Sequence, residues 1–133
     1  MKKIKLLIVD DVKLIRVELK AMLANYPDID IIGEANNGLK AKEMITELKP
    51  DALFLDICLP KLTGFELLDG MDSDIEVVFI SSYDKYMPEA QKYNATEFLM
   101  KPIKTEQLDK AVRKLIYNIS EKNQYLKEKE SMI

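Results

Sequence analysis

The stretch IKLLIVDD (residues 4–11) decides the fold, because an apolar run of strand length ends abruptly in two acids. ALFLD (52–56) repeats this form with Asp56 as its last residue, and EFLMKP (97–102) carries Lys101 just after its apolar part. Short apolar runs bounded by polar groups are consistent with buried strands. The predicted strands are residues 4–9, 30–34, 52–55, 77–80 and 98–100.

Amphipathic segments with apolar residues at helical spacing separate these strands. Strands that are apolar on both faces and alternate with helices are typical of a parallel sheet with helices on each side. Because crossovers between parallel strands are right-handed, the pattern favours an open, doubly wound α/β sheet. The predicted helices are residues 13–26, 38–48, 64–71, 85–94 and 105–119.

Length and composition limit the function classes that this chain can serve. A chain of 133 residues with 47% hydrophobic content is long enough for one domain with a core. Its 20 basic and 23 acidic residues nearly balance, which gives no electrostatic basis for binding nucleic acid. No apolar run approaches the roughly 20 residues of a membrane span, and acids follow the first apolar run too soon for a signal peptide. We therefore expect a cytoplasmic protein without a membrane partner.

Histidine is absent from the sequence, and Cys58 is its single cysteine. The absence of histidine excludes Ser-His-Asp and Cys-His catalysis and most zinc sites. A single cysteine excludes an internal disulfide framework. Any chemistry must therefore use carboxylates, hydroxyl groups and lysine.

Three acids end predicted strands and are candidate metal ligands. Ligands of a doubly wound sheet bind beyond the carboxyl ends of the strands, so we expect Asp10, Asp11 and Asp56 to converge there. Clustered carboxylates repel one another, and a bound cation offsets that repulsion. A hard cation such as Mg²⁺ prefers oxygen ligands, and the backbone carbonyl of Cys58 would fit as a further ligand. The sequence therefore predicts a magnesium site.

The same edge of the sheet carries groups suited to phosphoryl chemistry. A carboxylate such as Asp56 can attack phosphorus and become an aspartyl phosphate. Lys101 would pair with one phosphoryl oxygen as a point charge, and the hydroxyl of Ser81 would hydrogen-bond another. Pro102 follows the lysine, and a cis bond between them would turn Lys101 back toward the site.

Each of these residues has a plainer interpretation when it is taken alone. Asp10 and Asp11 could cap the helix that follows them, because aspartate is a good N-cap. Asp56 could be a loop acid and Lys101 a solvated lysine, and Ser81 is of a type common in turns. The combination of acids and a lysine at the ends of different strands favours one polar site.

The order DD (10–11), LDICLPKLTG (55–64), FISS (79–82) and FLMKP (98–102) resembles the response-regulator receiver domain of two-component signalling. The resemblance covers about residues 3 to 119, nearly the whole chain. It implies a flavodoxin-like sheet with the strand order 2-1-3-4-5 and a requirement for Mg²⁺. It also implies roles for single residues: Asp56 as phospho-acceptor, Asp10 and Asp11 as the acid pair, Lys101 as the family's lysine, Ser81 as the switch hydroxyl and Phe98 as the aromatic switch residue.

The resemblance implies a signalling module rather than an enzyme, one that catalyses only its own phosphorylation and dephosphorylation. A sensor histidine kinase would supply the phosphoryl group to Asp56. Ser81 would then move inward and Phe98 would rotate, so that the face made by the fourth helix, the fifth strand and the last helix changes shape. Homodimerisation on phosphorylation is a further expectation from the family.

The receiver pattern does not indicate which process such a module controls. Residues 1–119 form the predicted receiver domain, and residues 120–133 (SEKNQYLKEKESMI) a polar helical tail or linker. The stretch SSYDKY…FLMKPI is similar to receivers that precede a LytTR-type DNA-binding domain. The sequence shows no base-reading residues, so DNA binding would need an output domain outside these residues.

Two departures from the family pattern bear on the site. Ser82 stands where a small alanine is common, so Ser82 is the alternative to Ser81 as the switch hydroxyl. Cys58 and Tyr83 occupy positions that tune the lifetime of the phosphoryl group in this family. Neither residue is acidic or amide-bearing, which implies a different dephosphorylation rate.

Two other functions stay open at this point. A Mg-dependent phosphohydrolase that forms an aspartyl phosphate would need a second acid two residues after its nucleophile, where Cys58 stands, and a cap domain for its substrate. A pseudo-receiver, which binds partners without being phosphorylated, is disfavoured by the complete set of acids and lysine.

Overall fold

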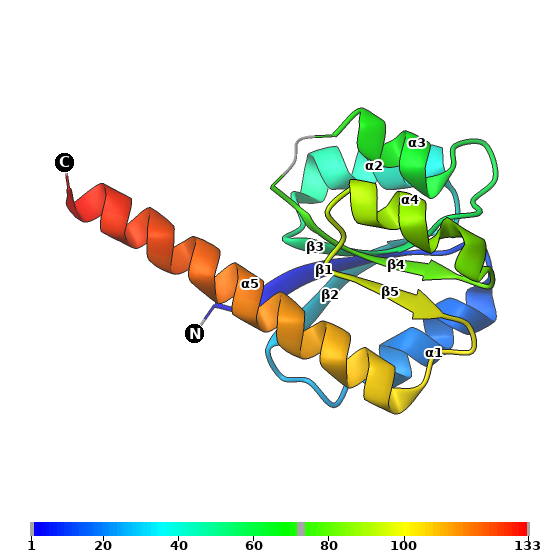
Figure 1. The fold of residues 1–133 in the computed structure, drawn as a ribbon, viewed down its shortest axis with the longest axis horizontal. Coiled ribbons are helices and arrows are strands. Elements are labelled where there is room, and N and C mark those ends of the chain that lie inside the picture. The colour runs from blue at the N-terminus through cyan, green and yellow to red at the C-terminus, as the bar shows by residue number, and fades with distance from the viewer. Residues whose placement is uncertain (1, 72–73, 133) are drawn as a thin grey trace.

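A parallel sheet of five strands, in the order β2-β1-β3-β4-β5, forms the centre of the molecule (Figure 1). The computed structural model describes residues 2–71 and 74–132. The architecture and the strand order confirm the predicted flavodoxin-like α/β fold. The strands are β1 (Ile4–Val9), β2 (Ile29–Ala35), β3 (Ala52–Asp56), β4 (Glu76–Ser81) and β5 (Glu97–Met100).

Helices cover both faces of the sheet, with α2, α3 and α4 on one side and α1 and α5 on the other (Figure 1). This arrangement follows from the right-handed crossovers between parallel strands. The helices are α1 (Lys13–Leu23), α2 (Gly38–Leu48), α3 (Gly64–Asp69), the 3₁₀ turn η1 (Asp84–Tyr86), α4 (Met87–Lys92) and α5 (Thr105–Ser131).

The core has two layers because successive side chains of each buried strand point to opposite faces. In the central strand β3, Phe54 packs into the layer under α1 and α5, whereas Leu53 and Leu55 pack into the layer under α2, α3 and α4. All of β3 is buried, as its uninterrupted apolar sequence requires. The core layers on the two faces of the sheet therefore fix the positions at which the strands end.

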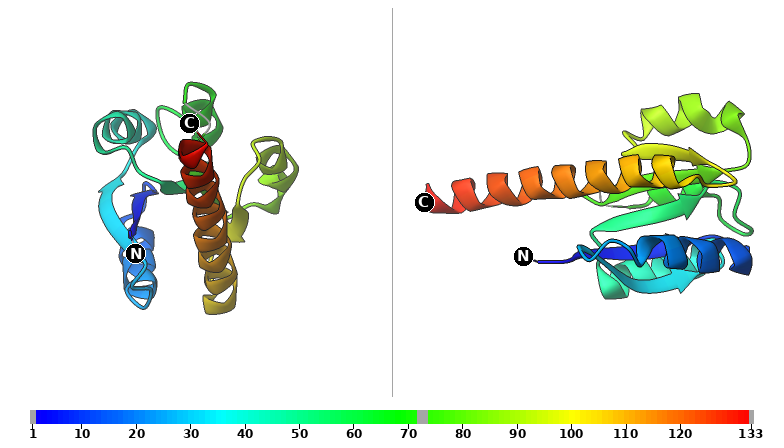
Figure 2. Two further views of the ribbon diagram at one scale, coloured as in Figure 1. Left: turned by 90° about the vertical axis from the view of Figure 1, so that its left-hand side faces the viewer. Right: turned by 90° about the horizontal axis from the view of Figure 1, so that it is seen from below.

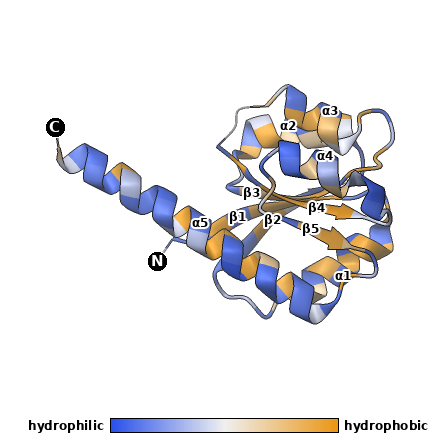
Figure 3. Ribbon diagram, in the orientation of Figure 1, coloured by the Kyte–Doolittle hydropathy of each residue, from blue (hydrophilic) through white to orange (hydrophobic). Residues whose placement is uncertain are grey.

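The predicted helix 105–119 and the predicted helical tail form one continuous helix, because α5 runs past residue 119 to Ser131. Its final turns leave the sheet and carry mostly polar residues (Figures 2 and 3). Two contacts tie the point of departure to the start of β4 and the residues before it: Asn118 Nδ2 donates to Glu76 Oε1 at 2.7 Å, and Lys122 Nζ donates to the carbonyl of Asp74 at 2.6 Å. The tail of residues 120–131 is thus helical, and its use as a linker stays a prediction.

Two other helices differ from the prediction at their ends. Helix α1 stops at Leu23 rather than at residue 26, since Pro27 disfavours the helical conformation for the residue before it. The predicted helix 85–94 is the turn η1 followed by the short helix α4, with Pro88 in its first turn, where the missing N–H costs nothing. No helix in the described ranges is long and apolar enough to cross a membrane.

Candidate functional site

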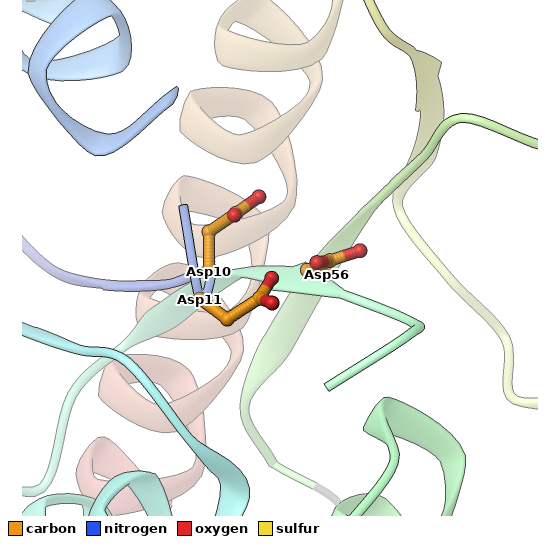
Figure 4. A group of neighbouring side chains, drawn as sticks. All are labelled: Asp10, Asp11 and Asp56. Carbon is orange, nitrogen blue, oxygen red and sulfur yellow. The ribbon is translucent and has the colours of Figure 1, made fainter. Parts of the chain in front are cut away.

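Three carboxylates meet where β1 and β3 end side by side (Figure 4). The register pairs Val9 of β1 with Leu55 of β3, so the residues that follow, Asp10 and Asp56, lie next to each other. Asp11 begins the turn toward α1. One carboxylate oxygen from each of Asp10, Asp11 and Asp56 lies within 4.8 Å of the other two. The structure thus brings together the three acids that the sequence singled out.

Asp10 is fully buried and its polar groups are fixed on several sides. Its N–H donates to the carbonyl of Ala35 at 3.1 Å, and its Oδ1 accepts from the N–H of Val12 at 2.9 Å. Its Oδ2 lies 2.8 Å from the Lys101 ammonium, yet this oxygen accepts no directed hydrogen bond from the described residues. A buried carboxylate oxygen in that situation is suited to a further cationic partner.

Asp56 is also buried, with only 4% of its surface exposed. Its Oδ1 accepts from the N–H of Cys58 at 3.3 Å, and its Oδ2 lies 3.5 Å from the Lys101 ammonium. Burial and the nearby charge of Asp10 raise the pKa of Asp56 to about 6, against the partial opposition of Lys101 and the Cys58 N–H. The exposed Asp11 lies on the solvent side of this pair.

Lys101 bridges the two buried acids from the end of β5. Its N–H donates to the carbonyl of Ser81 at 2.8 Å, and its peptide bond to Pro102 is cis. Burial alone would lower the pKa of Lys101, but the contact with Asp10 and the negative charges of Asp56 and Asp10 outweigh that effect, so its pKa is raised. The side chain therefore stays an ammonium, and it offsets part of the repulsion between the two acids.

The predicted switch residues lie beside this cluster rather than in it. Ser81 is buried at the end of β4, where its Oγ accepts from the N–H of Tyr83 at 3.0 Å and lies 3.2 Å from the Tyr83 carbonyl. Ser82 is exposed. Phe98 is half-buried on β5 and packs against the core layer under α2, α3 and α4. The switch roles of Ser81 and Phe98 stay predictions.

Two charged residues near the acids were not predicted from the sequence. Arg16 Nη1 donates to the backbone carbonyl of Asp10 at 2.8 Å, and Arg16 Nε donates to Glu34 Oε1 at 2.7 Å. A weak signal was present, because Glu34 is a charged residue that is not fully exposed near the end of the strand IDIIGEA. Its partner on α1 could not be read from the sequence, since no local spacing relates positions 16 and 34.

The residues at this edge fit a magnesium ion. The donors are carboxylate oxygens, which Mg²⁺ prefers, and one of them is the buried Asp10 Oδ2 without a directed hydrogen bond. Asp11 is exposed and gives the cluster contact with solvent, which suits an ion that keeps several of its waters. Cys58, whose carbonyl was the further predicted ligand, lies in the exposed loop after Asp56.

Comparison with known proteins agrees with this architecture. The family model for the response regulator receiver domain matches residues 6–113 of this chain. The chain belongs to the response-regulator receiver family. The receiver resemblance drawn from the sequence is therefore confirmed, whereas the similarity to LytTR-associated receivers stays a prediction.

Relatives of this receiver include proteins of about twice its length. It is 42% identical over 112 residues to a response regulatory protein of Vibrio cholerae, and this match covers 83% of this chain and 47% of that protein. It is 37% identical over 114 residues to the transcriptional regulatory protein BtsR of Escherichia coli K12, and this match covers 84% of this chain and 48% of BtsR. The chain thus spans about half the length of these relatives.

Solved receivers have the same fold. The response regulator domain of Thermotoga maritima CheB matches with a TM-score of 0.74 at 30% identity, over 86% of this chain and 97% of that one. The receiver domain of AraT from Geobacillus stearothermophilus matches with a TM-score of 0.83 at 25% identity, over 90% of this chain and 98% of that one.

Proposed function

We propose that this receiver accepts a phosphoryl group on Asp56, with Mg²⁺ held by Asp10, Asp11 and Asp56. The observation that carries the proposal is the half-buried ammonium of Lys101, which lies 2.8 Å from Asp10 and 3.5 Å from Asp56, in a cluster that the exposed Asp11 completes. A purely structural ion pair would need one acid for one lysine. Three acids around one lysine leave excess negative charge, which a divalent cation would neutralise.

In the proposed reaction, a carboxylate oxygen of Asp56 attacks phosphorus. The bond from phosphorus to the donor breaks, and the donor atom leaves with the electron pair. Bound Mg²⁺ would supply charge neutralisation between the carboxylates and the incoming phosphoryl oxygens. Lys101 is positioned to pair with a phosphoryl oxygen once Asp56 has been converted to its phosphate. The Cys58 N–H, which now holds Asp56 Oδ1, would help to orient the attacking carboxylate.

The proposed phosphoryl donor is a sensor histidine kinase, which carries the phosphoryl group on a histidine nitrogen. This places the proposed site of action in the cytoplasm. The chain would catalyse only its own phosphorylation and dephosphorylation, since catalysis rests on positioning and on charge rather than on turnover of a free substrate. Cys58 stands two residues after Asp56, where a phosphohydrolase would need an acid, and it argues against that alternative.

Phosphorylation is proposed to change the face that α4, β5 and α5 share. Ser81 Oγ would exchange its contacts with the Tyr83 backbone for a phosphoryl oxygen, and Phe98 would turn inward. The charge added at Asp56 would thus favour one of two conformations of this face. Homodimerisation through this face and DNA binding through an output domain outside these residues are the proposed consequences, in keeping with the name and length of relatives such as BtsR.

Incubation with acetyl phosphate and Mg²⁺, followed by intact-mass measurement, tests the proposal. We expect the wild type to gain one phosphoryl group that hydroxylamine removes, as it removes acyl phosphates. Asp56→Asn should gain none, whereas Asp30→Asn, which changes an exposed acid on β2, should behave as the wild type. Labelling of Asp56→Asn, or no labelling of the wild type, would contradict the proposal, and the second result would favour a pseudo-receiver.

A further inference from the structure

Strand β2 fixes the backbone of Asp10 from both ends of the residue. The N–H of Asp10 donates directly to the carbonyl of Ala35 at 3.1 Å. Its carbonyl accepts from Arg16 Nη1 at 2.8 Å, and the same guanidinium donates through Nε to Glu34, the residue before Ala35, at 2.7 Å. Asp10, Arg16 and Glu34 therefore form a closed bridge between the end of β1, the first turns of α1 and the end of β2.

The bridge is itself held in place. Glu34 Oε2 accepts from Lys20 Nζ at 2.6 Å, so both carboxylate oxygens of Glu34 are occupied. The Arg16 side chain is only 13% exposed, which reduces the screening of its charge by solvent. The hydrogen bonds from Lys20 and then from Arg16 lower the pKa of Glu34, so the carboxylate is charged at neutral pH.

We propose that Arg16 and Glu34 are positioning residues of the metal site, which hold the turn that carries Asp10 and Asp11 at the geometry Mg²⁺ requires. This inference rests on the proposed function. Magnesium tolerates little departure from octahedral geometry, and the partners that orient a ligand commonly matter to metal affinity nearly as much as the ligand. Arg16 is suited to this role because its planar guanidinium donates from two separate nitrogens in a fixed relation, Nε and Nη1, whereas an ammonium donates from a single rotatable nitrogen.

Charge and geometry predict different results when the bridge is broken. Loss of Arg16 removes a cation near the acids, and by charge alone that would strengthen Mg²⁺ binding. Loss of Glu34 removes an anion, and by charge alone that would weaken Mg²⁺ binding. A positioning role predicts that both losses weaken it. The two substitutions therefore separate positioning from simple electrostatics.

The experiment compares Arg16→Met and Glu34→Met with Arg113→Met by calorimetric Mg²⁺ titration. Arg113 is a matched control, since its Nε contacts Asp109 at the same 2.7 Å in an exposed pair. We expect both bridge variants to bind Mg²⁺ about tenfold more weakly than the wild type, and Arg113→Met to bind unchanged. Arg16→Lys, which keeps the charge, should not restore the affinity.

Amide exchange at Asp10 gives a second readout that needs no metal. Because the N–H of Asp10 donates to Ala35, loosening of the turn should make its exchange faster in both bridge variants and leave it unchanged in Arg113→Met. Should Arg16→Met fail to fold, Arg16→Lys and Glu34→Met carry the test.

Three results would overturn the inference: opposite changes in Mg²⁺ affinity for the two bridge variants, rescue by Arg16→Lys, or unchanged exchange at Asp10. A wild type that binds no Mg²⁺ would instead overturn the proposed function. The exchange at Asp10 would still decide whether Arg16 and Glu34 position the turn.

Discussion

Asp56 carries an electrostatic cost in the metal-free protein, because it is buried beside a second buried acid. Its pKa is about 6 in the folded protein against an ordinary value of 3.8. A carboxyl group with a raised folded-state pKa takes up protons on folding, so its ionised form destabilises the folded state above pH 6. That cost disappears as the pH falls below 3.8. The residue proposed for chemistry is thus one that the metal-free fold tolerates at a cost.

Asp56→Asn should therefore stabilise the metal-free protein at pH 7.5. We expect the free energy of unfolding to rise by about 1–3 kcal/mol, because a pKa raised to about 6 corresponds to about 3 kcal/mol at most and the substitution also removes the pairing with Lys101. The gain should be largely lost near pH 3.5, where most of the wild-type carboxyl groups are protonated in both states. Urea unfolding in EDTA at the two pH values measures this, with Asp30→Asn as the control. A variant less stable than the wild type at pH 7.5 would show that the pairing of Asp56 with Lys101 outweighs its burial.

For single residues, the sequence predicted the place in the fold best where the residue ends a strand. Asp10, Asp56 and Lys101 could be predicted to converge, because the carboxyl ends of parallel strands share one edge of the sheet. Arg16 and Glu34 could not, since their contact joins a helix to a strand that is 18 positions away and follows no periodic rule. Ser81 was found at the end of β4 as expected, but its contacts with Tyr83 depend on a turn geometry that the sequence leaves open.

The loop between β3 and α3 depends on close approaches that only glycine allows. A Cβ at Gly64 would lie 2.8 Å from the carbonyl oxygen of Asp56, and one at Gly38 would lie 2.3 Å from the carbonyl oxygen of Leu62. Lys61 in this loop adopts the left-handed conformation, with φ of 71°. The first residue of α2 thus limits the position of the loop that leaves Asp56.

Gly38→Ala should destabilise the protein, because backbone atoms would have to move to admit the methyl group. We expect a loss of about 1–3 kcal/mol, as for other cases of overpacking. Gly70→Ala is the matched control, since a Cβ there would meet no atom of the described residues within 4 Å. Urea unfolding of both variants measures the difference. Equal stabilities would mean that the loop at Leu62 yields freely and does not constrain Asp56.

Helix ends were predicted less well than strands, for a physical reason. The central strands β1, β3 and β4 are buried on both faces, so their apolar runs mark their limits closely. Residues 120–131 lack apolar periodicity, yet helix α5 continues through them. Glu, Lys and Gln favour the helix, and Asn118 and Lys122 hold its base through contacts with Glu76 of β4. Such contacts join distant positions, and the sequence gives no sign of them.

Across the whole molecule, the site joins the ends of several strands. Asp10 and Asp11 follow β1, Asp56 ends β3, and Lys101 follows β5. The doubly wound architecture could be predicted from the alternation of strands and helices, whereas the order of the strands came from resemblance to the receiver family. Because the ligands are far apart in the sequence, they converge only in the folded chain, and the unfolded chain has no comparable site. Metal binding is therefore coupled to the stability of the entire fold.

Magnesium should stabilise the folded chain by an amount fixed by its affinity. At a concentration ten times its Kd, a ligand that binds only the folded state adds about 1.4 kcal/mol to the free energy of unfolding. We expect this increase in urea unfolding of the wild type at pH 7.5, relative to NaCl of equal ionic strength. Asp11→Asn should lose most of it, and since Asp11 is exposed, the variant should otherwise fold as the wild type does. An equal response of both proteins to Mg²⁺ would show that the ion acts elsewhere, and that the three carboxylates do not form its site.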